Sequence, residues 1–168
     1  MERTKWVERK FNFDFPIGLF PAILERLRGT TARLREMTFS LSEVEAERKS
    51  GDKWSIKEQI GHLSDLESLH EGRIDDFIAR KATLRAWDIT NAATNNANHN
   101  DSSITELIDK FARKRNVFIS RLGQLNDETH RVKALHPRLL GEMRPVDLAY
   151  FTAEHDDHHL ASIRELMR

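Results

Sequence analysis

The sequence predicts an all-α fold, a four-helix bundle formed by a single domain over residues 1–168. Four stretches of about 20 residues each carry apolar side chains at steps of three and four, the spacing of one helix face. No segment shows the alternating pattern of a half-buried strand, and two long links lie among the connections. Amphipathic helices with no sheet to cover are expected to bury their apolar stripes against one another.

The helices are expected over residues 17–37, from 55 to about 80, from 103 to about 125 and from 145 to near the end of the chain, with a short helical turn at 40–45. Ser55 and Glu58 have the spacing of a capping box, in which the hydroxyl accepts an amide of the first turn and the glutamate reaches back. Ser103 and Glu106 repeat that spacing, and Pro145 suits the first turn of the last helix.

The segments outside these helices are expected to be irregular. Residues 1–15 are predicted to form an ordered N-terminal arm that packs its aromatic side chains on the bundle. Residues 82–101 lack periodicity and are rich in asparagine, whose side chain favours turns over helix interiors. A link of this length is usually functional or disordered. A second irregular link covers residues 126–144, and we expect His136 to belong to that loop.

Composition limits the classes of function. Lys plus Arg and Asp plus Glu are both 27, and this balance argues against a general nucleic-acid or membrane-surface binder. There is no cysteine, so the chain has no disulfide, no thiolate metal ligand and no cysteine nucleophile. The first residues are charged and form no signal core, and no apolar run approaches the ~20 residues of a membrane span. We therefore expect a cytoplasmic protein.

The most informative motif is a pair of histidines, His155 and His159, in the predicted last helix. Residues four apart lie one turn apart on the same face, so the two imidazoles can point at one spot. Apolar neighbours such as Phe151 and Ile163 indicate that this face is the buried one. A divalent transition metal would satisfy both rings at once. The spacing alone is equally consistent with ordinary core or surface histidines.

A third ligand is expected from the second predicted helix, where His62 lies on the flank of the apolar stripe. Three neutral nitrogens would leave coordination positions open for water or substrate, as a catalytic site requires. Asp156 could orient a ligand imidazole, and Asn98 and His99 could reach the mouth of the site from the long link. The simpler interpretation of Asp156 is a solvated helix acid, and that of Asn98 and His99 is plain turn residues.

The other polar candidates are expected to have no role at the site. We expect His70, His130 and His158 at the surface. The basic run from Lys110 to Arg115 is expected to form a solvated helix face.

The stretches around Trp54 and His62, and around His155 and His159, resemble the DinB superfamily, and within it the YfiT-like metal-dependent hydrolases. The family pattern is a tryptophan, then a helix with one histidine, and a last helix with His-x-x-x-His. The resemblance extends over nearly the whole chain. It implies up-down-down-up connectivity, often a homodimer, and a divalent metal such as zinc or nickel bound by His62, His155 and His159.

The resemblance is less specific about the reaction. Some relatives are thiol-dependent S-transferases that use a low-molecular-weight thiol such as bacillithiol or mycothiol, and others are hydrolases. Either implies a small-molecule substrate and a metal-activated nucleophile. The alternative is a non-catalytic dimeric bundle whose histidines bind a structural metal or lie in an interface.

Overall fold

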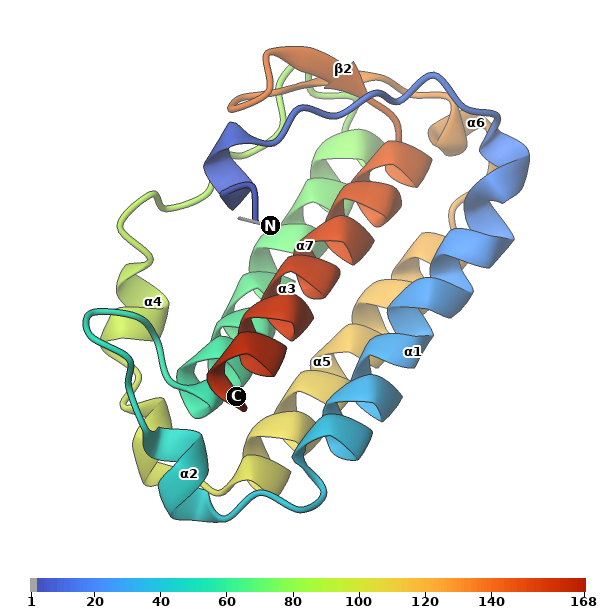
Figure 1. Cartoon of the computed structure of the whole chain (residues 1–168). Coiled ribbons are helices and arrows are strands. Elements are labelled where there is room, and N and C mark those ends of the chain that lie inside the picture. Colours follow the sequence, from blue (N-terminus) through green and yellow to red (C-terminus); the bar gives the residue numbers. More distant parts are fainter. Residues whose placement is uncertain (1–2) are drawn as a thin grey trace.

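The structure is a computed structural model that describes residues 3–168; Met1 and Glu2, which open the expected arm, lie outside the described residues. The long helices are α1 (Phe20–Thr38), α3 (Ile56–Ile78), α5 (Ile104–Gly123) and α7 (Pro145–Leu166) (Figure 1). Shorter elements are α2 (Glu43–Glu47), α4 (Ala92–Asn95), α6 (Asp127–His130), the 3-10 turns η1 (Trp6–Glu8), η2 (Ile17–Leu19) and η3 (His99–Asp101), and the strands β1 (Ala134–His136) and β2 (Gly141–Met143). The predicted four-helix fold is confirmed.

The predicted helix starts are set by local chemistry. The Ser55 hydroxyl accepts the amide of Glu58 at 3.1 Å, and the Glu58 carboxylate accepts the amide of Ser55 at 2.8 Å. The same reciprocal pair caps α5 through Ser103 and Glu106. Pro145 occupies the first position of α7, where its missing N–H costs nothing.

The helices follow the predicted up-down-down-up order. In Figure 1, α1 and α7 run one way along the bundle, and α3 and α5 run the other way. Each helix packs on two neighbours: α1 contacts α5 and α7, and α3 also contacts α5 and α7. The chain therefore crosses the bundle between α1 and α3 and again between α5 and α7. The long link from α3 to α5 joins two neighbouring helices that run in the same direction.

The core consists of two apolar clusters separated by a polar layer. One cluster contains Leu27, Ile74, Phe118 and Phe151 among others, and the second contains Leu34, Ile60, Phe111 and Ile163 among others. Between them the four long helices contribute buried polar residues that bond to one another, and these include Thr30, Glu67, Arg115 and Asp156.

Ion pairing holds this polar layer together. Nη2 of Arg115 lies 2.7 Å from Oε1 of Glu67 and 3.0 Å from Oδ1 of Asp156, and the Thr30 hydroxyl donates to Asp156 at 2.7 Å. Burial disfavours the charges, but the guanidinium outweighs it and holds the pKa of Glu67 at about 2. The expectation that the run from Lys110 to Arg115 forms a solvated face is therefore wrong for Arg115, which is 1% exposed.

The second link contains a short hairpin that the sequence analysis did not predict. Strands β1 and β2 pair antiparallel, with Ala134 opposite Met143 and His136 opposite Gly141. Ala134 and Met143 are buried against the apolar cluster that contains Phe151. Strands of three residues are too short to show a recognisable alternation.

The N-terminal segment packs its aromatic side chains on the bundle. Trp6, Phe11, Phe13 and Phe15 lie against the apolar cluster that contains Phe151, and the Trp6 ring is 5.0 Å from that of Phe151. Figure 1 shows this segment running from beside α7 to the start of α1, across the end of the bundle that carries β2. Among residues 3–168, no helix has a stretch long and apolar enough to cross a membrane.

Candidate metal centre

Three histidines from two helices converge at one point inside the bundle. His62 on α3 and His155 and His159 on α7 each offer a ring nitrogen, and these nitrogens all lie within 4.8 Å of one another. The Nε2 atoms of His155 and His159 are 3.0 Å apart. Bonds of about 2.1 Å to one ion would separate adjacent ligand nitrogens by roughly 3.0–3.4 Å. The nitrogens of His155 and His159 therefore have the spacing of two ligands of a common ion, and the nitrogen of His62 lies within 4.8 Å of both.

Hydrogen bonds select the nitrogen that faces this point in two of the three rings. Nδ1 of His159 lies 2.5 Å from Oε1 of Gln59, and Nδ1 of His62 lies 3.0 Å from the hydroxyl of Thr94. The Gln59 oxygen can only accept, so Nδ1 of His159 carries the proton and Nε2 keeps its lone pair. Partners of this kind fix the orientation of metal-binding imidazoles.

A chain of hydrogen bonds continues outward from His62. The Thr94 hydroxyl donates to Oδ2 of Asp65 at 3.1 Å, and Nε2 of His99 lies 2.7 Å from the same oxygen. His99 keeps the pKa of Asp65 low despite the burial that would raise it. A Cβ atom on Gly61 would lie 2.3 Å from the His99 ring, so the close approach of η3 to α3 requires glycine.

All three imidazoles are neutral at pH 7. Burial lowers the pKa of His62 to about 4, and it lowers the pKa of His155 and His159 well below the ordinary value of 6.5. Each ring also disfavours a proton on its neighbours, because two imidazolium charges would repel at this distance. Neutral imidazole is the form that binds a metal.

His155 carries the least satisfied polar atom of the cluster. Its Nδ1 is buried and has no hydrogen-bond partner among the described residues, while the Trp6 ring packs edge-on against the imidazole at 4.9 Å. Trp54 covers the opposite part of the cluster, with its ring 4.6 Å from that of His62. Three neutral imidazole nitrogens fit a divalent transition metal, and hydrogen bonds from outside the cluster orient two of the three rings. Three protein ligands leave coordination positions of such a metal open.

The cluster lies at the wall of a cavity of about 230 Å³. Aromatic and aliphatic side chains form much of the wall, including Trp6, Trp87, Leu66, Leu69 and Phe151. Its polar residues beyond the cluster are His70, His136, His158, Arg73, Arg138 and Asn91. The arrangement can therefore hold an ion and present it to a small molecule.

The structure places the other predicted site residues away from the three rings. The carboxylate of Asp156 is bonded to Arg115 and Thr30, and within residues 3–168 it forms no hydrogen bond to an imidazole. Asn98 is exposed in the left-handed conformation, with φ of 49°, and does not line the cavity. His99 is buried and reaches His62 only through Asp65 and Thr94.

Several residues that sequence reasoning set aside belong to this region. His70 was expected at the surface but is 4% exposed and lines the cavity. His158, also expected at the surface, is half-buried and lines it as well. His136 was expected in a loop but lies on β1 and is 1% exposed. Arg73, eleven residues after His62 and thus three turns along the same face, had a helical spacing that could have revealed it.

Gln59 and Thr94 were also missed, for different reasons. Gln59 precedes His62 by three residues, a helical neighbour that could have been noticed. Thr94 lies in the asparagine-rich link, and nothing in that segment marks which residue meets α3.

Comparisons with known proteins agree with this architecture. The fold is similar to that of YfiT from Bacillus subtilis, described as a probable metal-dependent hydrolase with an unusual four-helix bundle topology, with a TM-score of 0.80 and 16% identity. The similarity covers 96% of this chain and 93% of the YfiT chain, and at this identity it establishes the fold alone. A comparison with curated proteins found no match. The family model of the DinB superfamily matches residues 25–163. The chain belongs to the DinB superfamily.

Proposed function

We propose that this protein is a divalent-metal-dependent enzyme in which His62, His155 and His159 hold a single ion. The observation that carries the proposal is the convergence of three neutral imidazoles at the wall of a cavity. Zinc or nickel suits a ligand set made only of imidazoles. The YfiT structure is described as a probable metal-dependent hydrolase, and that description supports hydrolysis as one reaction for this site.

The proposed reactions are hydrolysis of a small molecule and transfer to a low-molecular-weight thiol. A bound ion would supply the same chemistry in both, because it lowers the pKa of a water or thiol that it binds. The chain would supply alignment and exclusion of water. Gln59 and Thr94 hold two of the rings, and Trp6 and Trp54 cover the cluster with apolar surface.

Metal analysis of purified protein tests the ligand set. We expect about one ion per wild-type chain and its loss in His62→Ala, His155→Ala and His159→Ala. His130→Ala is the matched control, because this histidine packs on Phe20 outside the cavity and should leave the metal content unchanged. Stoichiometric metal in all three cluster variants would contradict the proposal.

Substitution with cobalt separates the two reactions. A thiol that binds the ion would give a sulfur-to-cobalt charge-transfer band on addition of a low-molecular-weight thiol. Hydrolysis would instead appear as chelator-sensitive turnover of small esters or amides without any thiol. If metal-loaded protein gives neither of these signals, the result would argue against both reactions.

We also propose that the chain acts as one domain and forms a homodimer in the cytoplasm. These proposals rest on the sequence and on the family resemblance. Light scattering after size-exclusion chromatography would measure the oligomeric state, and a monomer at micromolar concentration would contradict the dimer.

A further inference from the structure

The cavity beside the histidine cluster has a strongly one-sided charge. Among the residues that the structure describes, its wall contains two arginines, Arg73 and Arg138, and neither aspartate nor glutamate. A bound divalent ion would make the interior more positive. A cavity of this kind attracts anions, because low-dielectric walls strengthen the field of the charges that line it.

Arg73 is buried, and no carboxylate of the described chain pairs with it. It is 2% exposed, and its Nε donates to the backbone oxygen of Arg85 at 3.2 Å, but it forms no ion pair within residues 3–168. The nearby carboxylate of Asp76 is already bonded to Arg85 and Lys81. Burial lowers the pKa of Arg73 to about 10, although Asp76 partly opposes this effect. A buried and unpaired guanidinium is costly, so a ligand that pairs with it would bind favourably.

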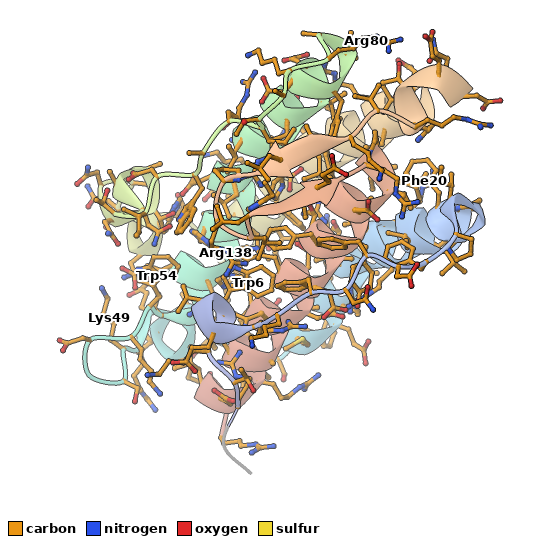
Figure 2. All side chains as sticks on the ribbon, turned by 90° about the horizontal axis from the view of Figure 1, so that it is seen from above. Trp6, Phe20, Lys49, Trp54, Arg80 and Arg138 are labelled. Atoms are coloured by element: carbon orange, nitrogen blue, oxygen red, sulfur yellow. The ribbon has the colours of Figure 1, made fainter. Side chains whose placement is uncertain are left out.

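Arg138 presents a second unmatched donor. Its Nη1 makes only long contacts of 3.4 Å to the backbone oxygens of Trp6 and Val7, and Nη2 is buried with no acceptor among the described residues. The guanidinium lies 5.4 Å from the ring centres of both Trp6 and Phe151. Figure 2 shows Arg138 and Trp6 close together, with Trp54 to their left.

His136 adds a neutral donor between these cations. Its Nδ1 accepts the backbone amides of Arg138 and Leu139 at 3.2 and 3.3 Å, so the ring proton must be on Nε2. That Nε2 is buried and has no acceptor within the described chain. Burial, and then the charges of Arg73 and Arg138, lower the pKa of His136 to about 3. The ring therefore stays neutral and keeps a donor available.

We propose that Arg73, Arg138 and Nε2 of His136 bind an oxyanion group, a carboxylate or a phosphate, of the molecule whose reacting atoms lie at the three histidines. This inference rests on the proposed function for the identity of that molecule as a substrate. Guanidinium groups match both oxyanions by paired hydrogen bonds. Nη2 of Arg138 and Nε2 of His136 have no acceptor within the described chain, and Arg73 has no ion-pair partner there, so these residues supply what such a group accepts.

The residues that line the cavity indicate what the rest of the bound molecule is like. Arg73 follows His62 by eleven residues, which places their Cα atoms about 16 Å apart along α3, and the arginine side chain leans back toward the helix start. Leu66 and Leu69 line the cavity between them. A volume of about 230 Å³ is below the range of roughly 300–1,000 Å³ of sites for drug-sized ligands. The expected ligand is a small acid with an apolar middle.

Calorimetric titration of the full chain tests the site without the metal. The protein is stripped with chelator and dialysed, so that a carboxylate probe cannot bind an ion. The probes are 3-phenylpropanoate, 2-phenylethyl phosphate and the neutral 3-phenylpropanamide. We expect at least one of the two anions to bind at millimolar concentration or tighter, and the amide to bind at least tenfold more weakly. The stronger of the two anions identifies the oxyanion class.

Variants assign the binding to the proposed residues. Arg73→Met and Arg138→Met should each weaken anion binding at least tenfold, and His136→Phe should weaken it as well. Arg121→Met is the control, since this arginine pairs with Asp75 outside the cavity. Circular dichroism checks folding, and if Arg73→Met does not fold, Arg138→Met decides the result.

Three outcomes would overturn the site: equal binding of the anions and the amide, no binding of either anion to wild-type protein, or unchanged binding in the folded variants. The result of the anion titration does not depend on whether the three histidines bind the ion. Anion binding by metal-free protein would survive a failure of the metal proposal. Conversely, Arg73→Met should retain the metal content of wild type even if the oxyanion site is absent.

Discussion

Nδ1 of His159 on α7 lies 2.5 Å from Oε1 of Gln59 on α3, so an amide one hundred residues earlier fixes the orientation of this imidazole. The consequence is seen on the other side of the ring, where Nε2 of His159 faces Nε2 of His155 at 3.0 Å. The lone pair on Nε2 of His159 is thus directed at Nε2 of His155, where either a proton on His155 or a cation between the rings would satisfy it. The outer hydrogen bond thus prepares the site for a cation.

Replacing Gln59 with leucine should weaken metal binding by about 10- to 100-fold, as is typical when the outer partner of a ligand histidine is removed. The side chain is close in size, so the fold should persist. Gln59→Glu keeps an acceptor for Nδ1 and should retain most of the affinity. Competition with a chromogenic chelator measures both dissociation constants, and equal affinities in the leucine variant and wild type would refute the orienting role.

Thr94→Val should weaken metal binding about tenfold or more, because it removes the acceptor of the His62 proton and the link to Asp65. Thr94→Ser restores the hydroxyl and is the matched control. Measurement by the same competition assay should rank wild type and Thr94→Ser together, above Thr94→Val. A valine variant with wild-type affinity would show that the chain from His62 to His99 does not influence the ion.

Arg115→Met should lower the free energy of unfolding by about 3–5 kcal/mol, because it leaves two carboxylates buried without their cation. Replacing Arg115, Glu67 and Asp156 together with apolar residues should recover much of this loss. The control Arg121→Met breaks a partly exposed pair and should change stability by no more than about 1 kcal/mol. Urea titration measures all three, and equal losses for Arg115→Met and Arg121→Met would contradict the prediction.

Metal-free protein should lose stability as the pH falls below 6.5, partly through His136. The folded pKa of His136 is about 3 and its ordinary value is 6.5, so the unfolded chain binds a proton in this interval and the folded chain does not. The contribution of His136 to the free energy of unfolding is complete above pH 6.5 and is lost progressively as the pH falls toward 3. His136→Asn should remove on the order of 2 kcal/mol of the decline between pH 7 and 4.5. Parallel stability curves for the two proteins would disprove the assignment.

Removal of the metal should leave the bundle folded. The two apolar clusters pack on either side of the polar layer without help from the three histidines. Adding metal at one hundred times its dissociation constant should then stabilise the protein by about 2.7 kcal/mol. Thermal melting with and without chelator measures this shift, and His62→Ala should abolish it. Unfolding on chelation would instead indicate a structural metal, because its binding energy would then be folding energy.

The fold could be predicted from local features of the chain. The capping pairs Ser55 with Glu58 and Ser103 with Glu106 act within one helical turn, and the structure has both. The spacing of His155 and His159 fixes their common face for the same reason. Their approach to His62 was suggested by its position beside the apolar stripe of α3 and by the family resemblance, and the structure brings the three rings together.

The sequence by itself determined the four long helices, the capping pairs that start α3 and α5, and the two histidines one turn apart, because each depends on residues a few positions away. Only the tertiary structure decided that Arg115 is buried between two acids, that His70 and His136 face the cavity, and that Arg73 has no carboxylate partner among the described residues. Whether a polar side chain is buried, paired or left to meet a ligand depends on groups that distant segments bring to it. Helical periodicity carries no information about those partners.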